Sequence, residues 1–162
     1  MPPFSKLLTV HEALERRATL KESGGTLVFT NGCFDILHPG HLDYLARARA
    51  LGSALFVGLN SDASVKRLKG PRRPINLEGD RALMLSGLAS TDGVVIFHED
   101  TPLNIIRLLV PDVLVKGGDW RTDDIVGGAE VAAAGGKVMS LPFLDGYSTT
   151  SIVSRILDLG GA

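Results

Sequence analysis

The sequence has only one cysteine, no long apolar run and almost no net charge. Cys33 by itself excludes an intramolecular disulfide, which is compatible with the cytosol. A formal net charge of −1 means that no global field draws the chain to nucleic acid or to a membrane surface. No apolar run approaches the roughly 20 residues of a membrane span, and no basic segment with an apolar signal core stands at the start. We therefore expect a cytoplasmic protein that binds neither nucleic acid nor membrane, and any anion-binding site must be local.

The chain has the size and composition of one globular domain, with 162 residues of which 44% are hydrophobic. Glycine is abundant at 19 residues, which suggests tight turns or loops where backbone approaches a ligand closely. No internal repeat, low-complexity tract or linker divides the sequence. We predict a single domain over residues 1–162, with an N-terminal helical segment over about 1–24 and a core over about 25–159.

Short apolar runs alternate with segments of helical spacing. A capping box from Thr9 to Glu12 predicts a helix over residues 9–22, and Thr101-Pro102 predicts a helix start with threonine as the cap. The predicted strands cover residues 26–30, 54–59, 93–97, 113–115 and 137–141. The other predicted helices cover residues 41–51, 61–68, 77–89, 103–109 and 149–159. This alternation predicts an α/β fold, a doubly wound Rossmann-like parallel sheet of five strands that binds ligands beyond their carboxyl ends.

The most informative segment runs from Thr30 to His41, between the first predicted strand and the helix that follows. It places His38 and His41 around a glycine at a helix N-terminus, where free backbone N–H groups and the helix dipole attract phosphate. Two imidazole donors on one side can bind a polyphosphate and follow negative charge as it moves to a leaving group. Gly32 and Gly40 would let backbone approach a nucleotide. Two ordinary surface histidines near a turn are the simpler alternative.

Metal binding is a competing use of paired histidines. A zinc site usually needs a third protein ligand, and neither His11 nor His98 stands in a ligand-like cluster. Asp35 follows the same strand and has two open roles, stabilising the turn or helping to place Mg²⁺ that a triphosphate brings. We therefore assign no metal ligand to the protein itself, and we interpret Cys33 as a packing residue.

A basic segment follows the second predicted strand. Its cations within eight residues are Lys66, Arg67, Lys69, Arg72 and Arg73. In a nearly neutral protein this run is either a solvated loop or a lid that neutralises charge during phosphoryl-type transfer. Lys69 is the strongest candidate, followed by Lys66, and the neighbouring arginines can reach a substrate phosphate.

Two further segments follow predicted strands. Ser148, Thr149 and Thr150 open the last predicted helix, where hydroxyls and free N–H groups form both an N-cap and a second anion cradle. The glycines of residues 115–120 let a nucleotide base lie against backbone, with Lys116 near phosphate. We interpret Trp120 as an ordinary packing residue.

These motifs resemble the nucleotidyltransferase superfamily that carries an H-x-G-H signature, and within it the heptose 1-phosphate adenylyltransferase family. The resemblance rests on residues 30–41, 60–70, 115–120 and 145–150, and it covers the chain from about Leu27 to Ile156. It implies a doubly wound sheet, signature histidines that bind the triphosphate, and an arginine near the nucleotide at Arg81. One departure is Phe143, where many cytidylyltransferases carry an arginine.

The family resemblance implies transfer of an adenylyl group from Mg²⁺-ATP to the sugar 1-phosphate D-glycero-β-D-manno-heptose 1-phosphate. The products would be ADP-heptose and pyrophosphate, towards the inner core of lipopolysaccharide. The expected catalytic residues are His38, His41 and Lys69. The expected nucleotide-binding residues are Thr30, Asn31, Gly32, Phe34, Gly40, Lys116, Gly117, Asp119, Ser148, Thr149 and Thr150. The expected substrate-binding residues are Asp35, Lys66, Arg72 and Arg81.

Two alternatives remain open at the level of sequence. A cytidylyltransferase acting on glycerol 3-phosphate or on a phospho-amino-alcohol would share the fold. A nucleotide-sensing module without catalysis would also share it, although the intact motifs argue against this reading. Related enzymes are often dimers, so a homodimer is expected, and the N-terminal helix can either supply that interface or cover the sheet.

Overall fold

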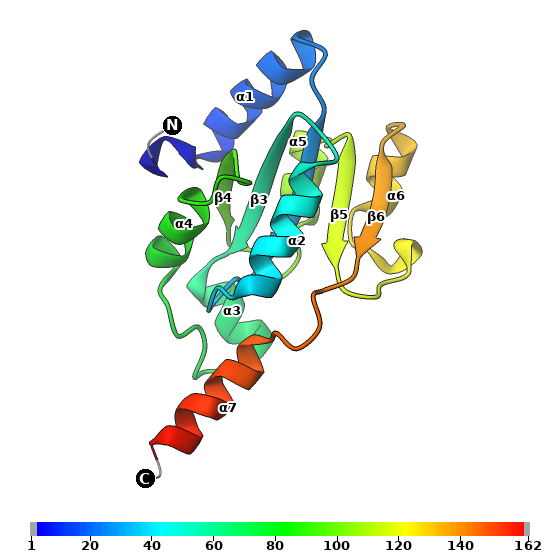
Figure 1. Ribbon diagram of the computed structural model, residues 1–162. Coiled ribbons are helices and arrows are strands. Elements are labelled where there is room, and N and C mark those ends of the chain that lie inside the picture. The colour runs from blue at the N-terminus through cyan, green and yellow to red at the C-terminus, as the bar shows by residue number, and fades with distance from the viewer. Residues whose placement is uncertain (1–2, 161–162) are drawn as a thin grey trace.

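The computed structural model describes residues 3–160, and its centre is a parallel sheet of six strands (Figure 1). The strands are β1 (Leu7–Leu8), β2 (Leu27–Gly32), β3 (Ala54–Asn60), β4 (Gly93–Phe97), β5 (Val113–Gly117) and β6 (Lys137–Leu141). Their order is β1-β4-β3-β2-β5-β6, and every neighbouring pair is parallel. The prediction of five strands was therefore wrong by one. The missed strand, β1, has two residues, too few to produce an apolar run, and it pairs with Val94 and Val95.

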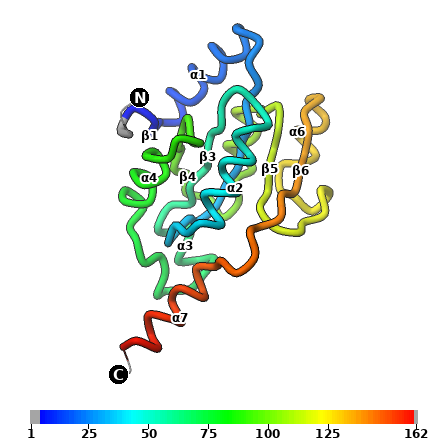
Figure 2. The backbone as a smooth tube through the Cα atoms, viewed as in Figure 1, coloured from blue at the N-terminus to red at the C-terminus, as the bar shows by residue number. Residues whose placement is uncertain are grey.

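Helices cover both faces of the sheet, as a doubly wound fold requires (Figure 2). They are α1 (Val10–Glu22), α2 (Pro39–Arg49), α3 (Asp62–Lys69), α4 (Glu78–Ser86), α5 (Leu103–Leu109), α6 (Gly128–Ala133) and α7 (Thr149–Leu159), with short 3-10 turns η1 (Pro3–Lys6) and η2 (Thr122–Asp124). One apolar cluster joins α2 and α4 to the sheet, and a second joins α1, α5 and α6 to its other face. The sheet is thus buried between two layers, which explains its continuous apolar strands.

Most helix ends agree with the local signals in the sequence. The capping box of α1 is confirmed, since the Thr9 side chain accepts from the Glu12 amide and the Glu12 carboxylate accepts from the Thr9 amide. At α5 the prediction was wrong, because Pro102 and not Thr101 occupies the cap position. Helix α2 begins at Pro39, two residues earlier than predicted, and α4 ends at Ser86, three residues earlier. Helix α6 was missed because its glycine and alanines give little apolar periodicity.

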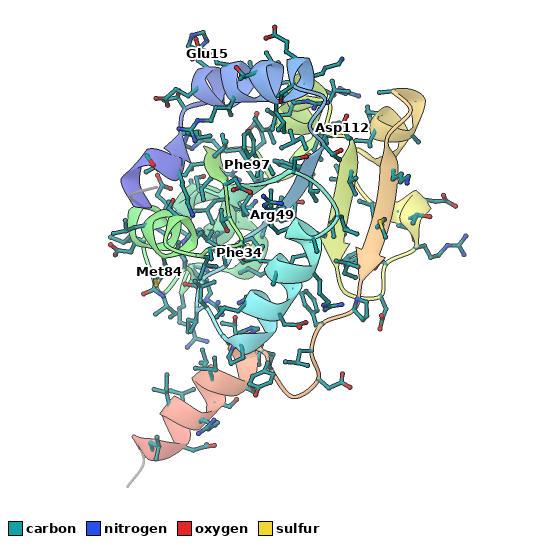
Figure 3. All side chains as sticks on the ribbon, turned by 45° about the horizontal axis from the view of Figure 1, so that its top comes forward. Glu15, Phe34, Arg49, Met84, Phe97 and Asp112 are labelled. Carbon is teal, nitrogen blue, oxygen red and sulfur yellow. The ribbon has the colours of Figure 1, made fainter. Side chains whose placement is uncertain are left out.

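Helix α1 covers the sheet, and its buried residue Arg17 bonds it to the segment before β5. The guanidinium of Arg17 donates to both carboxylate oxygens of Asp112 at 2.8 Å and to the carbonyls of Leu109 and Val110. Figure 3 places Asp112 beside the end of this helix. Of the two roles considered for the N-terminal helix, packing on the sheet is therefore the one that the structure shows.

The carboxyl ends of the strands point toward the end of the molecule from which α7 leaves (Figures 1 and 2). No residue of α7 is buried, and Ile156, Leu157 and Leu159 are more than half exposed. Within residues 3–160 no helix combines the length and the apolar character that crossing a membrane requires.

Candidate active site

A cavity of about 610 Å³ lies beyond the carboxyl ends of the strands. It is centred where β2 and β5 are neighbours, because the connection through α2 runs on one face of the sheet and the connection through α5 on the other. Its lining comes from the ends of β2, β3 and β5 and the segments after β2, β4, β5 and β6, together with residues of α2, the end of α3 and the start of α7. This is the switch point at which doubly wound sheets bind their ligands.

The two histidines of the signature lie against one another at the start of α2. His38 is the N-cap residue and Pro39 takes the first helical position, so the ring of His41 projects from the first turn. The two imidazole rings stack with centroids 3.8 Å apart at an interplanar angle of 21°. A side chain at Gly40 would bring a Cβ within 3.2 Å of the His38 ring and of the Cβ of Tyr147. Glycine therefore fits this packing between the signature and the segment before α7 without any shift of its neighbours.

Burial sets the charge state of this pair. Burial lowers the pKa of His41 to about 4, with a further lowering from the neighbouring His38. Burial also lowers the pKa of His38. Within the described residues, the Nδ1 atom of each ring is buried and makes no hydrogen bond. Near neutral pH the free protein thus carries two uncharged imidazoles with unused hydrogen-bonding capacity, which is suited to an anionic ligand.

Phe34 holds the second histidine from the other side. Its φ of 44° lies in the left-handed region, which is unusual for an aromatic residue and costs conformational energy. The ring meets that of His41 edge-to-face at 5.2 Å and covers Gly32, where a Cβ would lie 3.0 Å from it. Phe34 is therefore placed between the strand end and the histidine pair, and it lines the cavity.

Two lysines reach the cavity from opposite sides of β2. Lys69 is the last residue of α3, and Lys116 lies in β5. Burial lowers the pKa of Lys116, and the charge of Lys69 lowers it further. Burial raises the pKa of the Cys33 thiol. The charges of the two lysines lower this pKa by less, so it stays above its ordinary value. The thiol therefore stays protonated at neutral pH, which fits the interpretation of Cys33 as a non-catalytic residue.

The carboxylate of Asp35 has its hydrogen bonds filled by the protein. It is 2% exposed, and it accepts from Arg73 Nε at 2.5 Å and from the backbone amides of Ile75 and Asn76 at 2.8–2.9 Å. Burial raises the pKa of Asp35, but these hydrogen bonds outweigh it and hold the pKa below its ordinary value. Of the two roles left open by the sequence, stabilising the loop is the one that this geometry favours.

Several predicted residues do not line the cavity. Arg81 is fully buried, and its guanidinium donates to the carbonyls of Cys33 and Asn76 and to Asp62, so the contacts that the structure shows are structural. Thr30 is also fully buried, with its hydroxyl 2.5 Å from that of Tyr44. The side chains of Lys66, Arg72 and Asp119 are exposed outside the cavity. His38, Gly40 and Ser148 also lie outside its lining, although each is next to a residue that contacts or lines it.

The segment of Ser148, Thr149 and Thr150 lies next to the histidine pair. Thr149 and Thr150 line the cavity, and the Ser148 side chain caps α7 by accepting from the Ser151 amide at 3.0 Å. The ring of Tyr147 lies parallel to that of His38, with centroids 6.5 Å apart. The structure thus brings the starts of α2 and α7 to one cavity, as the sequence predicted.

Aromatic residues form the cavity wall on the β5 side. Trp120 is 51% exposed, which corrects its interpretation as a packing residue, and its indole N–H donates to the Gly117 carbonyl at 3.1 Å. Phe143 covers Gly117 so closely that a Cβ there would lie 2.5 Å from the ring. These rings, with Ile125 and Val126, offer an apolar surface of the kind that a nucleobase requires.

Polar residues on the opposite side of the cavity were missed by the sequence analysis. Arg73, which the sequence analysis had named, lines the cavity as well. The missed residues are Asn60, at the end of β3, and Asp100 and Thr101, which follow β4. The available signal was their place directly after strands whose carboxyl ends share one edge of the sheet. Within residues 3–160 no group of three or more histidine, cysteine, aspartate or glutamate side chains is arranged to hold a metal ion.

The low pKa of His41 predicts a stability change with pH. The unfolded chain binds a proton below about pH 6.5 whereas folded His41 does so only near pH 4, so stability falls as pH drops through this window. The largest possible slope is about 1.4 kcal/mol per pH unit, and partial exposure of the ring reduces it. We expect urea denaturation at pH 7 and pH 5 to show a smaller loss for His41→Asn than for the wild type. Equal losses would contradict the assigned pKa.

The fold has the arrangement of a nucleotide-binding α/β protein, with a cavity lined by cationic and hydroxyl side chains at the switch point of a parallel sheet. The sequence profile described as cytidylyltransferase-like matches residues 29–155. The chain belongs to this family, which places it among the nucleotidyltransferases.

Relatives and a solved structure agree with this assignment. The bifunctional protein HldE of Shewanella putrefaciens (strain CN-32 / ATCC BAA-453) is 59% identical over 137 residues, covering 85% of this chain and 29% of that protein. The bifunctional protein HldE of Shewanella denitrificans (strain OS217 / ATCC BAA-1090 / DSM 15013) is 60% identical over 134 residues, covering 83% and 28%. The chain therefore spans less than a third of these relatives. The crystal structure of the lipopolysaccharide core biosynthesis protein from Thermoplasma volcanium GSS1 matches with 27% identity and a TM-score of 0.63, covering 77% of this chain and 100% of that one.

Proposed function

We propose that the chain is an adenylyltransferase that converts D-glycero-β-D-manno-heptose 1-phosphate and ATP into ADP-heptose and pyrophosphate. The observation that carries the proposal is the convergence on one cavity of His41, which is stacked on His38, of the start of α7 and of two lysines. The choice of heptose is supported by the high identity to bifunctional HldE proteins and by the fold shared with a lipopolysaccharide core biosynthesis protein.

The proposed reaction is an in-line attack by an oxygen of the sugar phosphate on the α-phosphorus of ATP. A new P–O bond forms there while the bond to the β-phosphate bridging oxygen breaks, and the electron pair leaves with pyrophosphate. The attacking oxygen is already anionic, so the step needs no protein nucleophile and no strong general base. The protein's contribution is placement of the two substrates and stabilisation of the charge that moves to the leaving group.

Specific residues suit each part of that task. The uncharged imidazoles of His38 and His41 can donate to the triphosphate, and a polyanion beside them favours their protonation as charge develops. Lys69 and Lys116 supply positive charge on either side of β2. The start of α7 presents free N–H groups and the hydroxyls of Thr149 and Thr150 to the same space.

Mg²⁺ fits this site as part of the nucleotide substrate. The one carboxylate directly after β2, that of Asp35, already accepts hydrogen bonds at both oxygens. A metal that reaches the site coordinated by the triphosphate needs few protein ligands, as is common for Mg²⁺. We therefore propose that Mg²⁺ enters with ATP and neutralises phosphate charge during transfer.

The direct test is pyrophosphate release with a panel of substrates. The purified chain is incubated with ATP or CTP and with heptose 1-phosphate, glycerol 3-phosphate or phosphoethanolamine, each in the presence of Mg²⁺. We expect turnover with ATP and heptose 1-phosphate to exceed every other pair by at least about tenfold, since one good polar contact discriminates by that much. A preference for CTP would replace the adenylyl assignment by the cytidylyl alternative. Failure of every pair would favour a non-catalytic nucleotide-binding module.

We also propose that the enzyme acts in the cytoplasm, where ATP is available, and that it forms a homodimer. The exposed apolar side chains of α7 support an association between chains. Sedimentation velocity should report twice the mass of one chain, 17.2 kDa. A monomer at micromolar concentration would contradict the dimer without affecting the proposed chemistry.

A further inference from the structure

Arg73 is a cation of the cavity that carries unused hydrogen-bonding capacity. Its Nε donates to Asp35 at 2.5 Å, while within residues 3–160 its two terminal nitrogens make no hydrogen bond. The side chain is 26% exposed and lines the cavity. An arginine anchored through Nε presents the planar pair of terminal NH₂ groups outward, and this fork matches two oxygens of a phosphate.

The Asp35 carboxylate that positions Arg73 is itself held by several hydrogen bonds. The same Asp35 carboxylate also holds the backbone amides of Ile75 and Asn76, and the Asn76 side chain donates back to the Asp35 carbonyl at 2.5 Å. Arg81 adds a bond from its Nε to the Asn76 carbonyl at 3.0 Å. The loop that carries Arg73 is thus tied to the loop after β2, so the guanidinium loses little further freedom when it binds an anion.

The two sides of the cavity, on either side of β2, differ in chemistry. The aromatic wall of Trp120 and Phe143 lies after β5 and β6, on one side of β2. Arg73 is carried by the connection between β3 and β4, on the other side of β2, where Asn60 ends β3 and Asp100 and Thr101 follow β4. One half therefore suits an apolar base. In the other half Arg67 holds one oxygen of Asp100 and the Asn60 amide donates to Ser64, which leaves the second Asp100 oxygen, the Asn60 oxygen and the Thr101 hydroxyl for a polyhydroxylated molecule.

The reaction itself requires a second anion site. The histidines, the two lysines and the start of α7 are engaged by the triphosphate in the proposed function. The attacking phosphate must also lie close to the α-phosphorus, and two phosphates repel one another unless a cation holds the second. Arg73 is the cavity arginine with free terminal nitrogens among the described residues.

We infer that Arg73, positioned by Asp35, binds the phosphate of the sugar phosphate acceptor, while Asn60, Asp100 and Thr101 face its hydroxyl groups. This inference rests on the proposed transfer to a phosphorylated acceptor and assigns that acceptor to the β3–β4 half of the cavity. The sequence analysis named both Arg72 and Arg73 as able to reach a substrate phosphate, and only Arg73 lines the cavity, since Arg72 is exposed outside it.

The test separates acceptor binding from nucleotide binding. KM values for heptose 1-phosphate and for ATP are measured with Arg73→Gln, Arg73→Lys, Arg72→Gln and, as a control remote from the cavity, Arg107→Gln. Arg73→Gln should raise the KM for the acceptor by about 10- to 100-fold, because it removes a charge-assisted pair of hydrogen bonds. It should change the KM for ATP less than threefold. Arg73→Lys should recover only part of the loss, since an ammonium lacks the planar fork.

A binding measurement keeps the inference testable if heptose 1-phosphate is not the substrate. Calorimetric titration of the wild type and of Arg73→Gln, each saturated with α,β-methylene-ATP, is repeated with heptose 1-phosphate, glycerol 3-phosphate and phosphoethanolamine. Weaker binding of whichever acceptor the wild type binds supports the inference, even where the heptose assignment fails. An unchanged acceptor affinity, an equal loss for the nucleotide, a loss that follows Arg72→Gln instead, or no binding of any acceptor to the wild type would overturn it. Thermal unfolding of each variant identifies any loss that arises from misfolding.

Discussion

Replacing His41 by alanine is expected to lower kcat for pyrophosphate release by about 10²–10³, with a smaller effect on the KM for ATP. The physical reason is that a preorganised donor acts most strongly on charge that develops in the transition state, and removal of one such donor typically has this effect. His41 lines the cavity, and its ring is held between those of His38 and Phe34. The same substitution at His38 should give a loss of similar size.

The double variant should lose less than the product of the two single losses. The rings stack at 3.8 Å and act on one ligand, so each single variant already disturbs the partner. The matched control is His11→Ala, because His11 is an exposed residue of α1 whose imidazole lies 3.4 Å from Glu15. Its kcat should equal that of the wild type. If the variant that lacks both signature histidines kept near-normal turnover, their assigned role would be excluded.

The sequence predicted the position of the site better than the roles of its individual residues. His38, Lys69, Lys116 and Thr149 were placed by motifs that follow strands, and in a parallel sheet all carboxyl ends lie at one edge. This rule needs no knowledge of side-chain orientation. The convergence of three sequence segments on one cavity was therefore predictable from strand positions alone.

The sequence did not allow us to predict which side chains point into the cavity. Thr30 belongs to a strand whose two faces are both covered, so its hydroxyl meets Tyr44 and not a ligand. Arg72 and Arg73 are adjacent and chemically identical, yet only Arg73 lines the cavity. The hydrogen bond from its Nε to Asp35 holds its side chain there. Trp120 was interpreted as a packing residue from its size, but the left-handed Gly118 turns the chain so that the indole returns to the Gly117 carbonyl.

Arg81 illustrates how a family motif can mark a residue correctly while its role differs from contact with the ligand. The resemblance placed an arginine near the nucleotide, and Arg81 does lie directly beneath the cavity, bonded to the carbonyl of Cys33. Its side chain has no exposed surface, and its three bonds join Cys33 after β2, Asn76 before α4 and Asp62 at the start of α3. Its effect on the reaction should therefore come through the positions of other groups.

Replacing Arg81 by methionine is accordingly expected to reduce the free energy of unfolding by on the order of 3 kcal/mol. Methionine fills much of the volume but leaves the carbonyls of Cys33 and Asn76 and the carboxylate of Asp62 without their donor, and unpaired buried groups of this kind are strongly destabilising. For a chain of this size the melting temperature should fall by roughly 6–12 °C. Urea denaturation followed by circular dichroism measures the first quantity, and a thermal scan measures the second.

The control for this loss is Arg107→Met, which removes an exposed arginine paired with Glu130 on the surface of α5. Surface pairs of this kind contribute little, so its stability should match that of the wild type within error. Below its melting temperature, Arg81→Met should also raise the KM for the acceptor, because Asn76 and Asp35 together hold Arg73 in place. A variant with wild-type stability but a raised KM for ATP alone would instead show that Arg81 contacts the nucleotide directly. That result would require the buried guanidinium to become accessible when the nucleotide binds.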